Sequence, residues 1–416
     1  MKKFFRSICI LYFLQACCFP LSAQYVGKDV ALGKANAFLN RSGKSRAVDD
    51  PSSARRLSLA NDRDEFYVFN DEDNGGWVIV SGEERMPDVL GFSPDGNFDA
   101  DNIPCNMKAW LEDYARQVDY LRAHPEAMVT RITTPEREDI SPLLTCWFDQ
   151  DAPYNSKCPE IEGVHSNAGC VATAMAQVMY YYQWPKQTTD TIPGYTTKTL
   201  EIEMPAIPVT AIDWDNVLSE YQGEGNYGAA QTDAIATLML LCGCSVQTNY
   251  KKEGSGANYP AAIEALRHYF DYDDGIEEFD RDSCDTEVWE QMIYNELTNR
   301  RPVLYRGIKE AQASGHAFVI DGYREGYFHI NWGWGGQDAY VLMTSVDGWE
   351  ELLLSQGAVF GIRPASGGST SLSAVLDDGK TEVRWYDMGG RQREHPRKGL
   401  NITRMSNGTT KKILIR

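Results

Sequence analysis

The chain has 416 residues, of which 43% are hydrophobic and 24% charged, and its formal net charge is −19. This length suits two or three domains, and the composition is that of a globular protein with a sizeable core. Because nucleic-acid binding needs a basic face to neutralise phosphates, the acidic charge argues against it, and it would also repel anionic membrane surfaces.

The chain begins with the three-part pattern of a secretory signal. Its basic start consists of Lys2, Lys3 and Arg6. A mostly apolar stretch follows at 8–20, and small residues end at Ala23. Because this stretch is too short to span a membrane, we expect a signal peptide at 1–23, secretion, and no stable membrane insertion. Lipidation at Cys17 or Cys18 is the alternative, and the large polar Gln15 argues against it.

Seven cysteines remain after the signal: Cys105, Cys146, Cys158, Cys170, Cys242, Cys244 and Cys284. An odd number in an exported protein means that at least one thiol has no disulfide partner. The spacings contain no C-x-x-C pair, and the whole chain has only six histidines. We therefore expect no structural zinc and no other metal site.

The region 24–135 is predicted to be a small α+β domain. Helices are expected at 31–40 and 107–124, a hairpin at 65–70 and 76–81, and a third strand at 89–93. The polar stretch 46–64 is expected to lack regular structure. A polar junction at 130–139 follows, where Arg131 and Arg137 are candidate cleavage points.

The next region, 136–364, changes from helices to strands. Helices are expected at 170–182, 231–242, 259–270 and 287–299, and strands at 303–305, 316–321 and 327–331. A helical half followed by a strand-rich half indicates an α+β fold rather than repeated βαβ units. The tail, 365–416, is predicted to be a linker followed by a small β module.

Cys170 is the candidate nucleophile. Gly169 permits a tight turn before it, and the helix at 170–182 follows directly. The unpaired N–H groups and the dipole at a helix N-terminus stabilise a thiolate, and one backbone N–H there could hold a developing oxyanion. A buried structural cysteine is the alternative, because cysteine is among the most buried residue types.

His316 is the candidate general base. It follows a glycine and leads a mostly apolar strand, which would hold the ring rigidly while leaving it accessible. The run Asn331-Trp-Gly-Trp-Gly-Gly336 begins fifteen residues later. There Asn331 could fix the imidazole ring and Trp332 could shield that hydrogen bond.

Three blocks in this order resemble the streptopain family of papain-like cysteine peptidases. They are Gly169-Cys-Val-Ala-Thr-Ala174 with Gln177, Gly315-His-Ala-Phe-Val-Ile-Asp-Gly322, and Asn331-Trp-Gly-Trp-Gly-Gly336. The resemblance covers about 140–364. It implies a papain-like fold of two subdomains, one helical and one antiparallel β, with endopeptidase activity and no cofactor. It also implies that 24–135 is a prodomain that inhibits the enzyme within the same chain.

The resemblance also implies residues around the dyad. Gly315, Ser255 and Trp334 are expected to contact substrate. Papain has a glutamine six residues before its nucleophile, but Val164 stands there in this chain and cannot donate. In the stretch that begins at Trp147, which resembles the streptopain family, Gln150 is the predicted second oxyanion donor; a polar loop residue is the alternative.

The tail resembles the short sorting modules of Bacteroidetes proteins that leave by the type IX route. The strand-like runs Trp385–Arg391 and Lys411–Arg416 carry this likeness, and a small β appendage is the alternative.

The sequence therefore predicts a secreted thiol endopeptidase zymogen. Its expected partners are protein or peptide substrates and its own prodomain. The alternatives are a papain-fold binding protein that has lost turnover and a papain-fold acyltransferase that uses the same dyad.

Overall fold

The structure is a computed structural model of the 416-residue chain. It describes residues 25–42, 55–129, 137–223, 225–252, 254–307, 316–344, 346, 356–365, 384–386, 391–393, 399–404 and 410–415. The predicted signal peptide, the linker after 365, Arg131 and Gly315 lie outside these residues. No helix among the described residues is both long enough and apolar enough to cross a membrane.

A ten-stranded antiparallel sheet runs through the main body of the protein. Its strand order is β1-β2-β3-β4-β13-β12-β11-β10-β14-β9. The N-terminal region supplies β1 (Leu57–Asp62), β2 (Phe66–Asp71), β3 (Trp77–Ser81) and β4 (Val89–Ser93). The later strands are β9 (Glu277–Asp280), β10 (Val303–Arg306), β11 (Ala317–Arg324), β12 (Tyr327–Asn331), β13 (Ala339–Val341) and β14 (Gly357–Phe360).

Strand β1 corrects one expectation, because the polar stretch 46–64 does form a strand at Leu57–Asp62. Its residues are partly buried or exposed and none is fully buried, and it pairs with β2 at the edge of the sheet. Pairing along a strand that is already formed supplies backbone hydrogen bonds, so a weakly apolar segment becomes ordered there.

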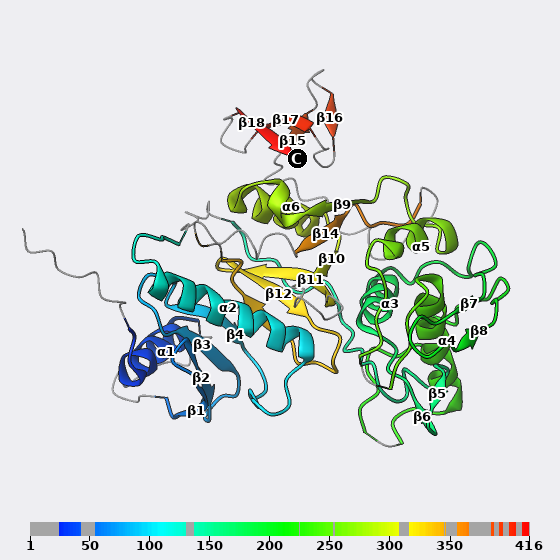
Figure 1. Ribbon diagram of the computed structural model, residues 1–416, viewed down its shortest axis with the longest axis horizontal. Coiled ribbons are helices and arrows are strands. Elements are labelled where there is room, and N and C mark those ends of the chain that lie inside the picture. Colours follow the sequence, from blue (N-terminus) through cyan, green and yellow to red (C-terminus); the bar gives the residue numbers. More distant parts are fainter. Residues whose placement is uncertain are drawn as a thin grey trace, which may run out of the picture.

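Helices cover both faces of this sheet (Figure 1). They are α1 (Lys28–Ser42), α2 (Cys105–Ala123), α3 (Cys170–Tyr182), α4 (Ala229–Ser245), α5 (Ala261–Tyr269) and α6 (Thr286–Thr298), with a 3-10 turn η1 (Arg281–Ser283). Helices α2 and α6 share one hydrophobic cluster with alternate residues of the strands, and α1 packs on the other face of β2–β4. This mixed helix and antiparallel-sheet architecture confirms the predicted fold class.

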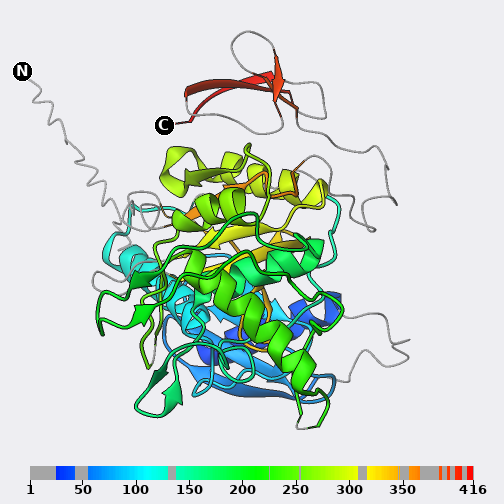
Figure 2. The same cartoon turned by 90° about the vertical axis from the view of Figure 1, so that its right-hand side faces the viewer.

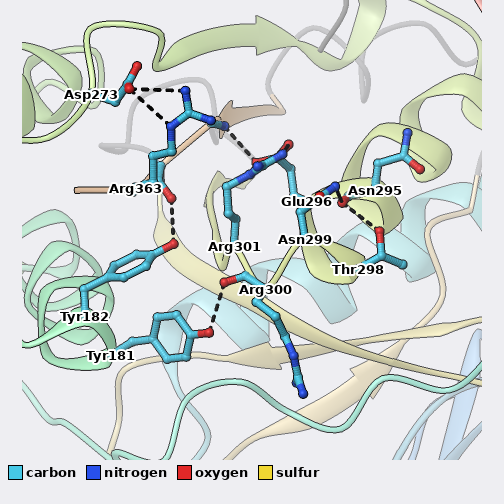
Figure 3. Close-up of polar contacts among 12 residues, drawn as sticks. Tyr181, Tyr182, Asp273, Asn295, Glu296, Thr298, Asn299, Arg300, Arg301 and Arg363 are labelled. Atoms are coloured by element: carbon cyan, nitrogen blue, oxygen red, sulfur yellow. Dashed lines mark hydrogen bonds and ion pairs between the residues drawn. The ribbon is translucent and has the colours of Figure 1, made fainter. Parts of the chain in front are cut away.

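Helix α3 is held at its C-terminal end by hydroxyl groups (Figure 3). Tyr181 donates to the carbonyl of Arg300 at 3.0 Å, and Tyr182 donates to the carbonyl of Ile362 at 2.7 Å. Arg301, next to the first of these carbonyls, forms a bidentate pair with Glu296 at 2.7 and 2.8 Å. These contacts fix α3 against the sheet, so the position of its N-terminus is also fixed.

The short remaining strands lie away from the main sheet. They form the hairpins β5 (Glu160–Ile161) with β6 (Val164–His165) and β7 (Tyr195–Thr196) with β8 (Glu203–Met204). Figure 2 shows the tail strands at one end of the molecule. They are β15 (Arg384–Tyr386), β16 (Gln392–Arg393), β17 (Gly399–Arg404) and β18 (Thr410–Ile415), and they form a four-stranded sheet, as expected for a small β module.

The N-terminal region and the later residues share one core. β4 pairs with β13, in which Tyr340 faces Phe92 and Val341 faces Gly91. Trp110 of α2 packs edge-on against Trp332, with ring centroids 6.3 Å apart. The N-terminal region is thus built onto the sheet that carries the later motifs.

Arg137, one of the two candidate cleavage points, has a buried side chain. Its guanidinium pairs with Glu290 at 3.2 Å and donates to Gln291 at 3.2 Å. A protease would have to break these contacts before it could bind this side chain, which argues against Arg137 as the cleavage point.

We predict that Trp110→Ala lowers the free energy of unfolding by about 3–5 kcal/mol, because it empties a buried aromatic site. Urea denaturation of the full chain measures this loss. Lys108→Ala, an exposed change two residues earlier on the same helix, is the control. Equal losses in the two variants would contradict the assigned role of Trp110.

Candidate active site

Cys170 is the first residue of α3, and the turn before it depends on a glycine. Gly169 has φ 95° and ψ 138°, a backbone conformation that is essentially restricted to glycine. A Cβ on it would lie 3.2 Å from the carbonyl oxygen of Ser255. The chain therefore turns sharply and places Cys170 where the helix has unpaired N–H groups.

The Cys170 thiol lies in a half-buried position with opposing influences on its pKa. Burial raises the pKa of the thiol, because it disfavours the thiolate. The backbone N–H groups of Ala317, Val171 and Cys170 itself act in the opposite direction. The Ala317 contact places the sulfur of Cys170 beside the start of β11.

His316 stands immediately before β11. Its carbonyl accepts the N–H of Gly307 at 2.7 Å, which ties it to the end of β10. Since Ala317 contacts the Cys170 sulfur, the fold brings His316 and Cys170 together although they are 146 residues apart in the sequence (316 − 170). The Nδ1 atom of His316 also lies 3.7 Å from the sulfur of Cys105.

Asn331 ends β12 and has three described contacts. Its side-chain oxygen accepts the amide of Gln177 and, at 3.1 Å, the N–H of Gly333. Its side-chain nitrogen donates to the carbonyl of Cys146 at 2.9 Å. Asn331 therefore joins α3 to the turn that follows β12, and its predicted contact with the imidazole stays a prediction.

Trp332 is buried directly beside this asparagine. Its ring lies 4.9 Å, between centroids, from that of Phe318 in β11. Its indole nitrogen has no hydrogen-bond partner among the described residues. Trp332 therefore forms an apolar wall at the start of β11.

The glycines after Trp332 let the turn pack closely on two other segments. Gly333, with φ 72°, would bring a Cβ within 2.9 Å of the Thr173 methyl group in α3. Gly335 donates its N–H to the carbonyl of Phe148 at 3.0 Å. Trp334, in the middle of the turn, is partly buried against the core and has an indole nitrogen with no described partner.

Gln150 is buried near the start of α3. Its backbone carbonyl accepts the N–H of Ala168 at 3.0 Å, two residues before Cys170. Its side-chain nitrogen has no hydrogen-bond partner among the described residues. A buried donor without a partner costs stability, so its presence beside the turn before Cys170 fits an amide kept available for another group.

Ser255 lies beside the same turn, and its hydroxyl is used within its own loop. The hydroxyl accepts the N–H of Lys251 at 3.0 Å and donates to the carbonyl of the same residue at 3.1 Å. Its carbonyl, by contrast, faces Gly169. Any substrate contact from Ser255 would therefore come from its backbone.

A buried ionisable cluster lies on β11 and β12. His329 Nδ1 lies 2.6 Å from a carboxylate oxygen of Asp321, whose other oxygen accepts the N–H of Leu144 at 2.9 Å. Burial disfavours the charge of His329, but the Asp321 carboxylate outweighs it and raises the pKa of His329. Burial raises the pKa of the nearby Asp338 to about 7.

Two residues at the site were not anticipated from the sequence, and both begin α2. Cys105 lies against His316, and Asn106 donates its side-chain amide to the carbonyl of Trp332 at 2.8 Å. The odd cysteine count was the one available signal for Cys105. Nothing in the sequence pairs either residue with a motif more than 200 positions later.

Family models match two parts of the chain. The Peptidase C10 family model matches residues 148–340, and the Spi protease inhibitor model matches residues 23–118.

The chain is also similar to individual proteins. It is 33% identical to streptopain of Streptococcus pyogenes over 336 residues, covering 75% of this chain and 80% of that protein. It is 30% identical to the thiol protease/hemagglutinin PrtT of Porphyromonas gingivalis, covering 81% of this chain and 40% of that protein. A solved fragment of Prevotella intermedia prointerpain A superposes with a TM-score of 0.63 at 29% identity, covering 74% of this chain and 98% of the fragment.

We predict that Gly169→Ala destabilises the protein by about 1–3 kcal/mol for a Cβ at this positive φ, and by more because that Cβ is crowded against the Ser255 carbonyl. It should also slow alkylation of Cys170, because relaxing the turn moves the start of α3. Gly163→Ala is the control, since it shares a positive φ but has open space around it. Urea denaturation measures the stability, and mass spectrometry of the peptide that contains Cys170 measures its alkylation rate. If the two variants do not differ, the crowding argument is refuted.

Proposed function

The chain belongs to the Peptidase C10 family of thiol proteases, and on that basis we propose that it is a secreted cysteine endopeptidase made as a zymogen. In this proposal Cys170 is the nucleophile and His316 is the general base. The substrates are proteins or peptides.

One arrangement supports this proposal above the others. Cys170 stands at the N-terminus of α3, and its sulfur contacts the backbone N–H of Ala317, the first residue of β11. His316 is the residue immediately before that strand. A thiolate needs nearby donors, and a base must stand within reach of the thiol proton. In this proposal the first turn of α3 provides the donors and the residue before β11 provides the base.

The reaction follows from these positions. His316 accepts the thiol proton, and the Cys170 sulfur attacks the carbonyl carbon of the scissile bond. His316 then donates the proton to the leaving amine. A water molecule, deprotonated by the same imidazole, attacks the acyl carbon; the C–S bond breaks, the acid product leaves, and the Cys170 sulfur takes the proton back from the imidazolium.

The oxyanion needs two donors, and we assign the second to Gln150. The N–H of Cys170 at the start of α3 is the first. The buried side-chain amide of Gln150 has no described partner, and its segment is hydrogen-bonded to the residues just before Cys170. Preorganised donors of this kind stabilise the negative charge as it develops.

We assign the N-terminal region, 24–135, as an inhibitory prodomain. Its helix α2 places Cys105 on the imidazole of His316 and Asn106 on the backbone of Trp332. While α2 stays there, a substrate could not approach the imidazole from the side that Cys105 covers. Cleavage near the junction at 130–139 would let the region leave, and Arg131 is the remaining candidate within it.

Export is the last part of the proposal. The signal-like start and the small β tail support secretion with a tail-dependent sorting step by the type IX route. We place the catalytic domain at 136–364 and the sorting module within 365–416.

The principal test is casein hydrolysis by the purified zymogen under reducing conditions, beside a Cys170→Ala twin. We expect the wild type to shorten by about a prodomain and to gain activity that a thiol alkylator abolishes. The twin should stay full length and inert. If both stay inert after an added protease has removed the prodomain, the proposed dyad is wrong and a binding protein becomes the better interpretation.

Loss of one oxyanion donor typically lowers turnover by about 10²–10³, so we expect Gln150→Ala to lose about that much kcat. KM for a peptide substrate should change much less, since the donor acts on the transition state. Gln222→Ala, which removes an exposed amide that donates to the carbonyl of Gly335, is the control. Unchanged kcat in Gln150→Ala would exclude it as the donor.

A further inference from the structure

Two cysteines from different parts of the chain flank His316. Cys105 is the first residue of α2, and Cys170 is the first residue of α3. The sulfur of Cys105 lies 3.7 Å from Nδ1 of His316, and the sulfur of Cys170 lies against the N–H of Ala317, the next residue. The N-termini of two helices and one imidazole thus meet around two thiols.

The Cys105 end of this arrangement is anchored. Asn106, the next residue of α2, is buried and donates to the carbonyl of Trp332 at 2.8 Å. One turn further along α2, Trp110 packs against the ring of the same tryptophan. Because Asn106 and Trp110 both hold the start of α2 against Trp332, the Cys105 thiol stays beside the active site for as long as the prodomain is attached.

The two thiols differ in accessibility. Cys105 is exposed, whereas Cys170 is only half-exposed. Although the residue as a whole is exposed, the surrounding protein desolvates its sulfur, and this effect, followed by repulsion from the neighbouring Cys170, raises the pKa of Cys105 to about 11. Its thiol therefore carries a proton at neutral pH. A base at hand is therefore needed for Cys105 to react, and His316 is in contact with it.

We propose that Cys105 and Cys170 form a disulfide in the zymogen under oxidising conditions, which blocks the nucleophile until a reductant opens it. This inference rests on the proposed function for the role of Cys170. It differs from inhibition by contact alone, because removing the covalent block requires electrons as well as prodomain cleavage.

The oxidant is a low-molecular-weight disulfide, RSSR. The exposed Cys105 gives its proton to His316, and its sulfur attacks RSSR; the S–S bond breaks, a mixed disulfide forms and RS⁻ leaves. This RS⁻ takes the proton from the His316 imidazolium and becomes RSH. The freed imidazole then accepts the proton of the Cys170 thiol, the Cys170 sulfur attacks the Cys105 sulfur, and the second RS⁻ leaves and takes that proton. The protein loses two protons and two electrons, and RSSR is reduced to two RSH.

The role of the disulfide follows from export of the protein and from the position of Cys105 in the part of the chain that is removed. An exported protein meets oxidising surroundings, where an active thiol is open to irreversible oxidation. A disulfide to the prodomain protects the nucleophile reversibly. Once the zymogen is reduced and cut, Cys105 departs with the prodomain and cannot block Cys170 again.

The test treats the full-length zymogen with oxidised glutathione, alkylates the remaining thiols and digests the denatured protein without reductant. A protease that cleaves after glutamate places Cys105 in the peptide 85–112 and Cys170 in the peptide 163–201, each with no other cysteine. We expect these two peptides to be joined and to separate on adding dithiothreitol.

Two variants sharpen this test. Cys105→Ser should lose the joined pair and leave Cys170 either alkylated or carrying glutathione. Cys284→Ser, which removes a half-exposed cysteine at the end of η1, should keep the pair. If wild-type peptides 85–112 and 163–201 stay separate after oxidation, the disulfide is refuted, whether or not the variants fold.

The mass measurement does not depend on turnover, so the two proposals fail separately. Casein cleavage by the reduced, processed enzyme without any joined peptides would refute the disulfide and keep the peptidase. Joined peptides from an enzyme that never cleaves casein would support the disulfide and contradict the peptidase.

Discussion

The pairing of β4 with β13 determines how the rest of the molecule is arranged. Through this pair the four N-terminal strands continue the sheet that contains β11 and β12. Backbone pairing within a buried sheet allows only one register, because a shift by one residue would turn every side chain to the other face. Helix α2, which packs on β2–β4, is thereby carried across to Trp332 and His316.

This continuity gives a physical reason why the N-terminal region could control the site. It contacts the imidazole of His316 and both the backbone and the ring of Trp332. It therefore covers these residues while its own side chains belong to the same hydrophobic core. Leaving would expose the buried faces of Trp110 and β4, which makes spontaneous release costly. In the proposed activation, chain cleavage would favour release, because a separated region gains the translational freedom that a tethered one lacks.

The site itself shows how local and distant constraints combine. The positive φ of Gly169 turns the chain into α3, and the tyrosine contacts at the other end of α3 hold the helix in place. Gln177 from the middle of this helix then fixes Asn331. Each of these side chains acts at a distance from the thiol, yet together they decide where the thiol lies relative to His316.

The sequence by itself determined the helix that begins at Cys170, the strand after His316 and the α+β class, because periodicity and glycine placement are local properties. It also carried the family, through three short blocks. Only the tertiary structure decided that β1 forms, that Arg137 is buried against Glu290, and that Cys105 lies on His316. Those outcomes depend on contacts between residues far apart in the chain, for which a single sequence has no pattern to read.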